Sequence, residues 1–410
     1  MSDPAASDRI LTRGFCLAFV SSLCYFGGIG VVLPVLPIFV THQLGGDNLT
    51  VGIVVGIFAA SAVLARPIAG RLGNRLGRRM LMVAGAATVA VSVALYGVAG
   101  GLGVLVLLRL VTGAGEGVYF TGSATLVADM APPDRRAQVL SYFSVALFAG
   151  LGIGPLLGQA VYSSSGAATA FVVAGALAMV GSLVATQVPN PGIEPATQRA
   201  SHLLNRKAIG PGLVLTLGIM GVTAFQAYTP LYAEQLHMAG PQFVFLLYAV
   251  VVLVTRVVGA PLADRVGVKR IATLATGVIV LGLGTMALWA TPTGLYVGSV
   301  PFALGISLQY PALMTMVVNR VEAHERAAAV GTFTTAFDLS QGAAGVILGG
   351  VAAAAGYRAS FGAAGGFALI GLVVFLAKVG RTDPSQPAPE AQSERAVLGD
   401  PDAWLPPGAD

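Results

Sequence analysis

Three ionisable side chains lie inside long apolar stretches of the sequence, namely Arg109, Glu116 and Asp338. A charge near the middle of a lipid bilayer costs at least about 2.5–3.5 kcal/mol, so such residues are candidates for function. A carboxyl group in apolar surroundings can load and release a proton near neutral pH. We therefore expect Glu116 to be the principal proton-coupling group and Asp338 the second candidate. The alternative for each acid is a structural hydrogen bond or ion pair.

Arg109 is expected to be the positive charge that tunes Glu116. The two residues are seven positions apart, which places them on one helix face with Gly113 but about 10 Å apart along the axis. Direct contact within an ideal helix is therefore excluded, and Arg109 would act on the carboxyl group through its electric field.

These residues need membrane-spanning helices to position them. The chain has 410 residues, of which 55% are hydrophobic and 10% are charged, whereas roughly a quarter are charged in soluble proteins. A span takes about 20 mostly apolar residues, and about twelve segments qualify. They lie near residues 15–40, 50–70, 80–100, 102–129, 138–160, 168–187, 211–233, 242–263, 271–290, 294–319, 329–353 and 359–380. The sequence thus predicts an all-α membrane protein with twelve transmembrane helices.

A duplication explains the order of these segments. The arginine-rich stretch 65–79 has an echo at 255–269, with Arg66 matching Arg256 and Gly77 matching Gly267 at a constant offset of about 190 residues. Two pseudo-symmetric six-helix bundles follow from this repeat. The predicted units are an N-terminal tail at 1–14, a bundle at 15–188, a linker at 189–210, a second bundle at 211–380 and a disordered tail at 381–410.

The basic residues predict the orientation in the membrane. Lysine and arginine fall on alternate loops, with Arg358 as the exception, and loops that carry them tend to stay in the cytoplasm. Both termini are therefore expected to be cytoplasmic. The chain is expected to be a multi-pass protein of the cytoplasmic (inner) membrane of a bacterium.

Four short motifs, in this order along residues 13–380, resemble those of the major facilitator superfamily. The closest resemblance is to its twelve-helix drug:proton antiporter branch, which includes arabinose-efflux-like permeases. The matching residues are Pro34 and Pro37 in the first span, Gly70, Leu72, Arg75, Gly77, Arg78 and Arg79 in the loop after the second, Arg109 and Gly113 in the fourth, and Gly150, Gly154, Pro155 and Gly158 in the fifth.

The sequence departs from this family pattern at three places. Asn74 stands where the family loop has aspartate, and Gln159 replaces the last glycine of the antiporter motif. The first apolar segment, 15–40, contains no acid, although many drug:proton antiporters carry one there. The missing acid weakens any preference for cations, and the fold is unaffected.

The resemblance implies a cytoplasmic gate built from the two arginine-rich loops. An acid at the position of Asp129 pairs with loop arginines in similar transporters, so we expect Asp129 to pair with Arg75, Arg78 or Arg79. A solvated interfacial acid is the alternative. The expected gate residues are Arg66, Gly70, Asn74, Arg75, Gly77, Arg78, Arg79, Asp129, Asp264 and Arg265.

The antiporter motif itself forms a smooth stripe, since Gly150, Gly154 and Gly158 recur every four positions and Pro155 bends the helix. A stripe that packs in one state and parts in another would close the outer end of a central cavity. A static packing groove is the alternative.

Aromatic and amide side chains in several spans are the expected lining of a substrate cavity. They suit a large, mostly apolar ligand with one or two polar anchors, although packing is the more common role of such side chains. The expected lining is Tyr25, Phe26, Tyr119, Phe225, Gln226, Tyr228, Gln309, Tyr310 and Phe337.

The expected function is proton-coupled efflux of small amphipathic molecules or drugs by antiport, with alternating access. Export of sugars or other polar metabolites is the second transport hypothesis, and a non-transporting membrane sensor is the hypothesis from another class. No nucleotide-binding loop and no Ser/His/Asp set supports an enzyme.

The expected partners are a small-molecule substrate, protons and the lipid bilayer, and the expected active form is a monomer. The basic residues lie in short loops, which argues against a nucleic-acid partner. The histidines lack metal-ligand spacing, so neither a metal nor another cofactor is expected beyond the proton gradient. Cys16 and Cys24 lie about 12 Å apart on one helix and cannot form a disulfide.

Overall fold

The protein is almost entirely helical in the part that the structure, a computed structural model, describes. This part comprises residues 12–132, 136–189, 205–321 and 325–379. The α-helices are α1 (Arg13–Ile38), α2 (Asn48–Leu76), α3 (Arg78–Ala94), α4 (Leu102–Met130), α5 (Arg136–Ala185), α6 (Arg206–Gln235), α7 (Gln242–Val266), α8 (Val268–Leu288), α9 (Pro292–Val318) and α10 (Arg326–Val374), with short turns of other helix types at Phe39–Gln43, Tyr96–Val98 and Phe375–Val379.

Glycines at matching positions break or start helices in both halves of the chain. Helix α5 contains two helices joined at Gly166 (φ 80°, ψ 177°), and α10 contains two joined at Gly356 (φ 81°, ψ 176°). Gly77 (φ 86°) and Gly267 (φ 88°) precede α3 and α8 in the same way. Each pair is 190 residues apart, and only glycine adopts these angles without strain. The backbone therefore supports the duplication that the sequence predicts.

Most of the helices have the length and composition of membrane spans. Within the described residues, nine helical segments are long and apolar enough to cross a bilayer, and Gln242–Arg256 is apolar but shorter. Two of the nine contain the glycine breaks of α5 and α10. The protein is thus a multi-pass, all-helical membrane protein, while the count of twelve spans and the side on which the termini lie stay predictions.

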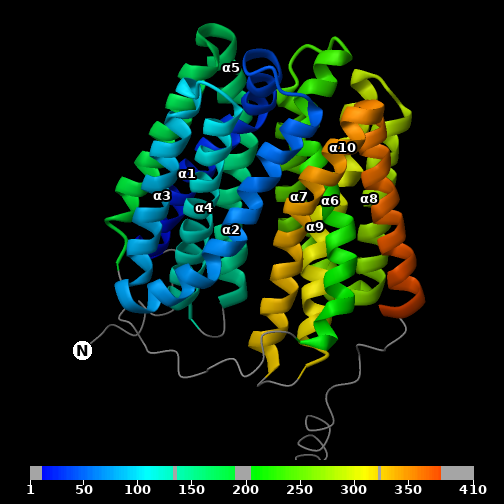
Figure 1. Ribbon diagram of the computed structural model, residues 1–410. Helices are drawn as coiled ribbons and strands as arrows, with labels where there is room; N and C mark the ends of the chain where they lie inside the picture. Colours follow the sequence, from blue (N-terminus) through cyan, green and yellow to red (C-terminus); the bar gives the residue numbers. More distant parts are fainter. Residues whose placement is uncertain (1–11, 133–135, 190–204, 322–324, 380–410) are drawn as a thin grey trace, which may run out of the picture.

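The helices form two bundles that stand side by side (Figure 1). Helices α1 to α5 make the first bundle and α6 to α10 the second, with α1 packed on α5 and α6 packed on α10. Between the bundles, α2 packs on α10 and α5 packs on α7. Helices α1 and α6 also pack on each other across this interface.

Helices α2 and α10 approach most closely near one end, through glycines. A Cβ atom added at Gly345 would lie 2.7 Å from the Cα of Gly56, and one added at Gly52 would lie 2.9 Å from the Cα of Gly349. One turn before Gly345 in α10, a Cβ atom at Gly342 would be 3.7 Å from the nearest α2 atom. The two helices diverge from there toward the other end.

Hydrogen bonds between the bundles reinforce this contact at Asn48. Its side-chain amide donates to the carbonyl oxygen of Ala352 at 3.2 Å and accepts from the Tyr357 hydroxyl at 3.0 Å. The Tyr228 hydroxyl donates to the Asn48 carbonyl oxygen at 3.2 Å. We call the region of Asn48, Gly52, Gly345, Gly349 and Tyr357 the closed end.

A capping residue starts α2 next to the closed end. The Asp47 carboxylate accepts hydrogen bonds from the Thr50 backbone N–H at 2.8 Å and from the Thr50 hydroxyl at 2.6 Å. These bonds hold the pKa of the Asp47 carboxyl below its usual range. They also satisfy a backbone donor that the first turn of a helix leaves without an acceptor.

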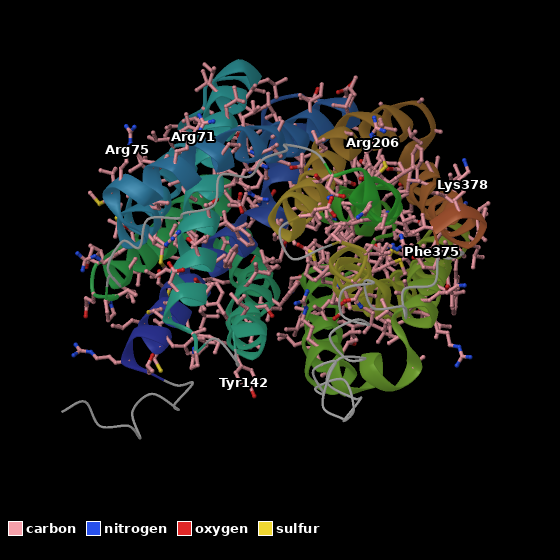
Figure 2. The ribbon with its side chains drawn as sticks, turned by 90° about the horizontal axis from the view of Figure 1, so that it is seen from below. Arg71, Arg75, Tyr142, Arg206, Phe375 and Lys378 are labelled. Atoms are coloured by element: carbon pink, nitrogen blue, oxygen red, sulfur yellow. The ribbon has the colours of Figure 1, made fainter. Side chains whose placement is uncertain are left out.

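The opposite end carries basic residues from both bundles. Figure 2, seen from below, shows Arg71 and Arg75 on the first bundle and Arg206 and Lys378 on the second. All four side chains are exposed. We call this the arginine end, and it is the end that the positive-inside rule predicts to be cytoplasmic.

Candidate functional site

Glu116 lies in the middle of α4 and forms an ion pair with Arg66 of α2. The Glu116 Oε2 and Arg66 Nη2 atoms are 3.9 Å apart, and the two side chains are 13% and 24% exposed. The Arg66 guanidinium also lies over the Phe120 ring, 5.1 Å from its centroid. A carboxylate and its counter-charge are therefore held together inside a span, on two neighbouring helices.

Arg109 does not contact Glu116, as their seven-residue spacing implies, and its role as the tuning charge stays a prediction. Its Nε donates to the carbonyl oxygen of Val54 at 2.9 Å, and its guanidinium lies 4.4 Å from the centroid of the Phe58 ring. The side chain is buried and ties α4 to α2. Two helical turns separate it from Glu116, so the nearby positive charge comes from Arg66, which the sequence had placed in the gate.

A stacked pair of tyrosines lies between α1 and α4 near Glu116. Tyr25 and Tyr119 are fully buried with ring centroids 3.8 Å apart and an interplanar angle of 18°. The Tyr119 hydroxyl bonds to the hydroxyl groups of Ser21 at 3.1 Å and Ser22 at 2.9 Å. Among the described residues, the Tyr25 hydroxyl has no hydrogen-bond partner. Both tyrosines belong to the core of the first bundle and do not line an open cavity.

A small cavity of about 20 Å³ lies between the two bundles. That volume holds about one water molecule, whereas a drug-sized ligand needs about 300–1,000 Å³. Of the nine expected lining residues, Phe225 and Gln226 are at this cavity. The full lining is Leu33, Phe148, Leu151, Val222, Phe225, Gln226, Phe245, Tyr248 and Ala249.

The other expected lining residues are not among those that line this cavity. Gln309 is fully buried and donates to the Thr276 hydroxyl at 3.1 Å, inside the second bundle. Tyr310 packs on Phe337, with ring centroids 5.7 Å apart. Tyr228 belongs to the contacts of the closed end. Phe26 is buried against Tyr119.

Sequence reasoning missed Phe148 and Tyr248, which line the cavity from α5 and α7. Both lie in segments that are apolar all round, so no periodic pattern marks the face that turns toward the other bundle. Their aromatic type was the only available signal, and other aromatic residues in the spans share it.

The glycines of the antiporter motif pack within the first bundle. A Cβ atom at Gly154 would lie 2.6 Å from the Cα of Gly30, and one at Gly150 would lie 2.7 Å from the Gly27 nitrogen. Gly158 meets Val31 in the same way, at 3.0 Å from its Cα. The stripe therefore faces α1 in this state, and both its role in closing the cavity and the static packing groove stay predictions. The glycine contact that joins the bundles is the one between α2 and α10.

At the arginine end, the predicted pairing of Asp129 with a loop arginine is confirmed. Its carboxylate forms an ion pair with the Nε of Arg78. The neighbouring Arg79 donates to the Val188 carbonyl oxygen at 3.5 Å, and Gly77 supplies the left-handed residue before α3. These contacts join α3, α4 and the end of α5 within one bundle, while Gly70 is exposed with open space around it.

Several predicted site residues fall outside the described part of the chain. They are the side chains of Asn74, Asp264, Arg265 and Asp338. Their roles as gate and proton-coupling residues stay predictions, as do the linker and tails that cover 1–11, 190–204 and 380–410. Across the described ranges, no group of three or more His, Cys, Asp or Glu side chains lies together as a metal site requires.

Comparison with known sequences agrees with this architecture. The sequence profile described as the Major Facilitator Superfamily matches residues 18–271 and 240–407. An uncharacterized MFS-type transporter of Salmonella typhimurium is 29% identical over 360 residues, which cover 84% of this chain and 91% of that protein. The uncharacterized MFS-type transporter YhhS of Escherichia coli is 26% identical over 409 residues, covering 96% of this chain and 100% of that protein.

Solved transporter structures share the fold. A peptide transporter, POT, in complex with sulfate superposes with a TM-score of 0.77 at 17% identity, covering 92% of this chain and 97% of that one. The nucleoside transporter NupG gives 0.74 at 13% identity, covering 89% and 99%. The sequence profile spans most of the chain, and these structures have the same arrangement of helices. The chain therefore belongs to the Major Facilitator Superfamily and is a multi-pass membrane transporter.

Proposed function

We propose that this transporter exports small amphipathic molecules in exchange for protons, by alternating access between its two bundles. The observation that carries the proposal is the ion pair between Glu116 and Arg66 inside the span. Protonation of the carboxyl group removes the charge that holds Arg66 to α4. One proton can thereby change a contact between two helices, one of which, α2, forms part of the closed end.

The two ends of the molecule provide the elements that alternating access requires. The bundles are joined at the closed end and diverge toward the arginine end. A substrate would enter from the arginine end, and export would require the α2–α10 contact to open. Arg66 lies on the same helix, α2, as Gly52 and Gly56. Protonation of Glu116 would therefore act on the helix that also forms the α2–α10 contact at the closed end.

The lining of the central cavity favours amphipathic compounds over sugars. Gln226 is its amide residue, and most of the others are aliphatic or aromatic. Sugars need several hydrogen-bonding partners once they are removed from water. The cavity of about 20 Å³ must widen before a ligand binds, and separation of α5 from α7 would provide this space.

The proposed setting is the inner membrane of a bacterium, with the protein active as a monomer and driven by the proton gradient. No further cofactor takes part in the proposed cycle. Asp129 and Arg78 are proposed to hold the arginine end in shape, and Asp338 is proposed to be the second acid that carries protons.

Uptake into inside-out vesicles tests this proposal, because the cytoplasmic face of an exporter then faces the medium. Vesicles containing the wild type, Glu116→Gln or Glu325→Gln, with an imposed pH gradient that is acidic inside, would be offered a panel of fluorescent amphipathic compounds in the medium. Glu325 is a matched control because it pairs with Lys207 at 2.9 Å outside the spans. We expect proton-driven transport in the wild type and the control, and its loss in Glu116→Gln.

Two results would contradict the proposal. Undiminished substrate-driven proton movement in Glu116→Gln would exclude this residue as the coupling group. Transport that persists after a protonophore collapses the gradient would exclude proton coupling altogether. A protein that moves no compound of the panel would favour a non-transporting sensor.

A further inference from the structure

Arg256 of α7 is a half-buried arginine that reaches across the bundle interface. Its guanidinium lies 4.6 Å from the centroid of the Phe148 ring of α5, and its Nη1 donates to the Ser144 hydroxyl at 3.4 Å. Its Nε is buried without a hydrogen-bond partner. Within the described residues, no carboxylate lies within ion-pair distance of it.

The internal repeat explains why this arginine lacks a counter-charge. Arg256 follows Arg66 by 190 residues, and Arg66 is paired with Glu116. The residue 190 positions after Glu116 is Ile306, which is buried and cannot carry charge. The second half has kept the cation and has an aliphatic residue in place of its acid.

The close contacts of two glycines show that the 190-residue offset also holds for the packing of the helices. A Cβ atom at Gly115 of α4 would lie 3.1 Å from the Gly85 carbonyl oxygen of α3. In the second half, the matching Gly305 of α9 meets Ala275 and Ile279 of α8, with a Cβ atom 3.0 Å from the Ile279 nitrogen. Helices α4 and α9 therefore present equivalent residues to equivalent neighbours, and Ile306 occupies the place of Glu116.

The aromatic surroundings of the arginine are retained. Arg66 lies over the Phe120 ring. The residue 190 positions after Phe120 is Tyr310, which is close enough to Arg256 to interact with it electrostatically. The second half thus keeps the cation and its aromatic neighbour, and it has Ile306 at the position that corresponds to Glu116. An anion from outside the protein would complete this site.

The position of Arg256 connects it with the central cavity. Its stacking partner Phe148 lines the cavity, as does Tyr248, which also interacts electrostatically with Arg256. Arg256 is eight residues after Tyr248, so it lies on the same face of α7 about two turns nearer the arginine end. A ligand that enters from that end meets Arg256 before it meets the apolar lining.

We propose that Arg256 binds the anionic group of the transported molecule, so that the substrates are amphipathic organic anions with an apolar, aromatic-sized body. A carboxylate, sulfonate or phosphonate would accept hydrogen bonds from the guanidinium fork. The body of the molecule would pack against Phe148, Phe225 and Tyr248. Burial of a cation between two bundles is costly without a counter-charge, and the ligand supplies that charge. This inference rests on the proposed function as an exporter.

Equilibrium binding tests this site without a membrane gradient. The purified full-length protein would be titrated calorimetrically with aryl carboxylates of increasing ring number and with the carboxamide of each. A carboxylate and its carboxamide have nearly the same shape, so the comparison isolates the charge. We expect carboxylates to bind the wild type more tightly than their carboxamides do.

Variants assign this preference to one residue. Arg256→Gln is expected to weaken carboxylate binding at least about tenfold, which is the smallest effect expected of a lost charge-assisted hydrogen bond, and to leave carboxamide binding unchanged. Arg256→Lys keeps the charge and loses the fork, so an intermediate affinity is expected. Arg206→Gln is the matched control, because it removes an exposed arginine from the same bundle at the same end.

Three results would overturn the anion site, and one would overturn only the proton coupling of the proposed function. Wild-type protein that binds no carboxylate more tightly than its carboxamide lacks the site, and this measurement requires no variant to fold. Equal carboxylate binding by Arg256→Gln and the wild type would show that Arg256 only joins α7 to α5. Intact carboxylate binding combined with gradient-independent transport would contradict proton coupling alone. Proton-driven export of uncharged compounds, unchanged in Arg256→Gln, would contradict the anion site alone.

Discussion

Replacement of Gly345 by alanine is expected to open the closed end. The added Cβ atom would lie 2.7 Å from the Gly56 Cα and closer still to the Gly52 carbonyl oxygen, whereas ordinary contacts of this kind begin at about 3.4 Å. The obstructing atoms are backbone atoms and cannot rotate away. Helices α2 and α10 must therefore separate by at least about 0.7 Å, the difference between 3.4 and 2.7 Å for the Gly56 Cα atom.

The magnitude follows from the cost of overpacking. An extra methyl group in a tightly packed interface costs about 1–3 kcal/mol. The strain exists only while the bundles touch at the closed end, so it raises the free energy of this conformation and not that of the conformation in which the end is open. A difference of that size shifts the ratio of the two populations by roughly 5- to 150-fold toward opening.

Distances between spin labels measure this shift. Labels at Ser164 and Ala354, both exposed beside the glycine breaks of α5 and α10, report the separation of the bundles there. Native Cys16 and Cys24 would first be replaced by serine. Gly345→Ala is expected to increase the long-distance population in electron–electron resonance measurements.

Two matched glycines serve as controls for this experiment. A Cβ atom at Gly342 would be 3.7 Å from the nearest α2 atom, and one at Gly350 would have nothing within 4 Å. Neither Gly342→Ala nor Gly350→Ala is expected to change the distance distribution. If Gly345→Ala gives the same distribution as these controls, the α2–α10 glycine contact does not hold the end closed.

Two further predictions concern the first bundle. Gly154→Ala would place a Cβ atom 2.6 Å from the Gly30 Cα inside that bundle. We therefore expect the free energy of unfolding to fall by about 1–3 kcal/mol, while the distances between the spin labels stay unchanged. Altered label distances without a loss of stability would favour a gating role for the motif. Asp129→Arg is expected to reduce the rate of export, and the double exchange with Arg78→Asp to restore it. The Arg78 and Asp129 side chains are 27% and 38% exposed, so the pair contributes less than about 1 kcal/mol to stability and its loss should not unfold the protein. Failure of the double exchange to restore export would argue against a role of this ion pair in the gate.

Much of the architecture is determined by local sequence. Apolar runs of span length follow from composition, because an unsatisfied backbone is intolerable in lipid and the chain must form helices there. The repeat could be located from the matched residues of stretches 65–79 and 255–269, and the positive φ angles of Gly77 and Gly267 agree with it. The Asp129–Arg78 ion pair was expected from the resemblance to similar transporters, in which an acid at this position pairs with loop arginines.

The partners of the intramembrane residues depended on tertiary packing. Helical periodicity placed Glu116 and Arg109 on one face, yet the positive charge beside Glu116 is Arg66 of another helix. The same periodicity revealed the stripe of Gly150, Gly154 and Gly158 without showing that it meets α1. Spans that are apolar on every side carry no pattern that says which neighbour each face will meet. Among the described residues, Arg256 has no acidic partner, whereas Arg66 pairs with Glu116. This difference depends on the residue that the fold places opposite each arginine.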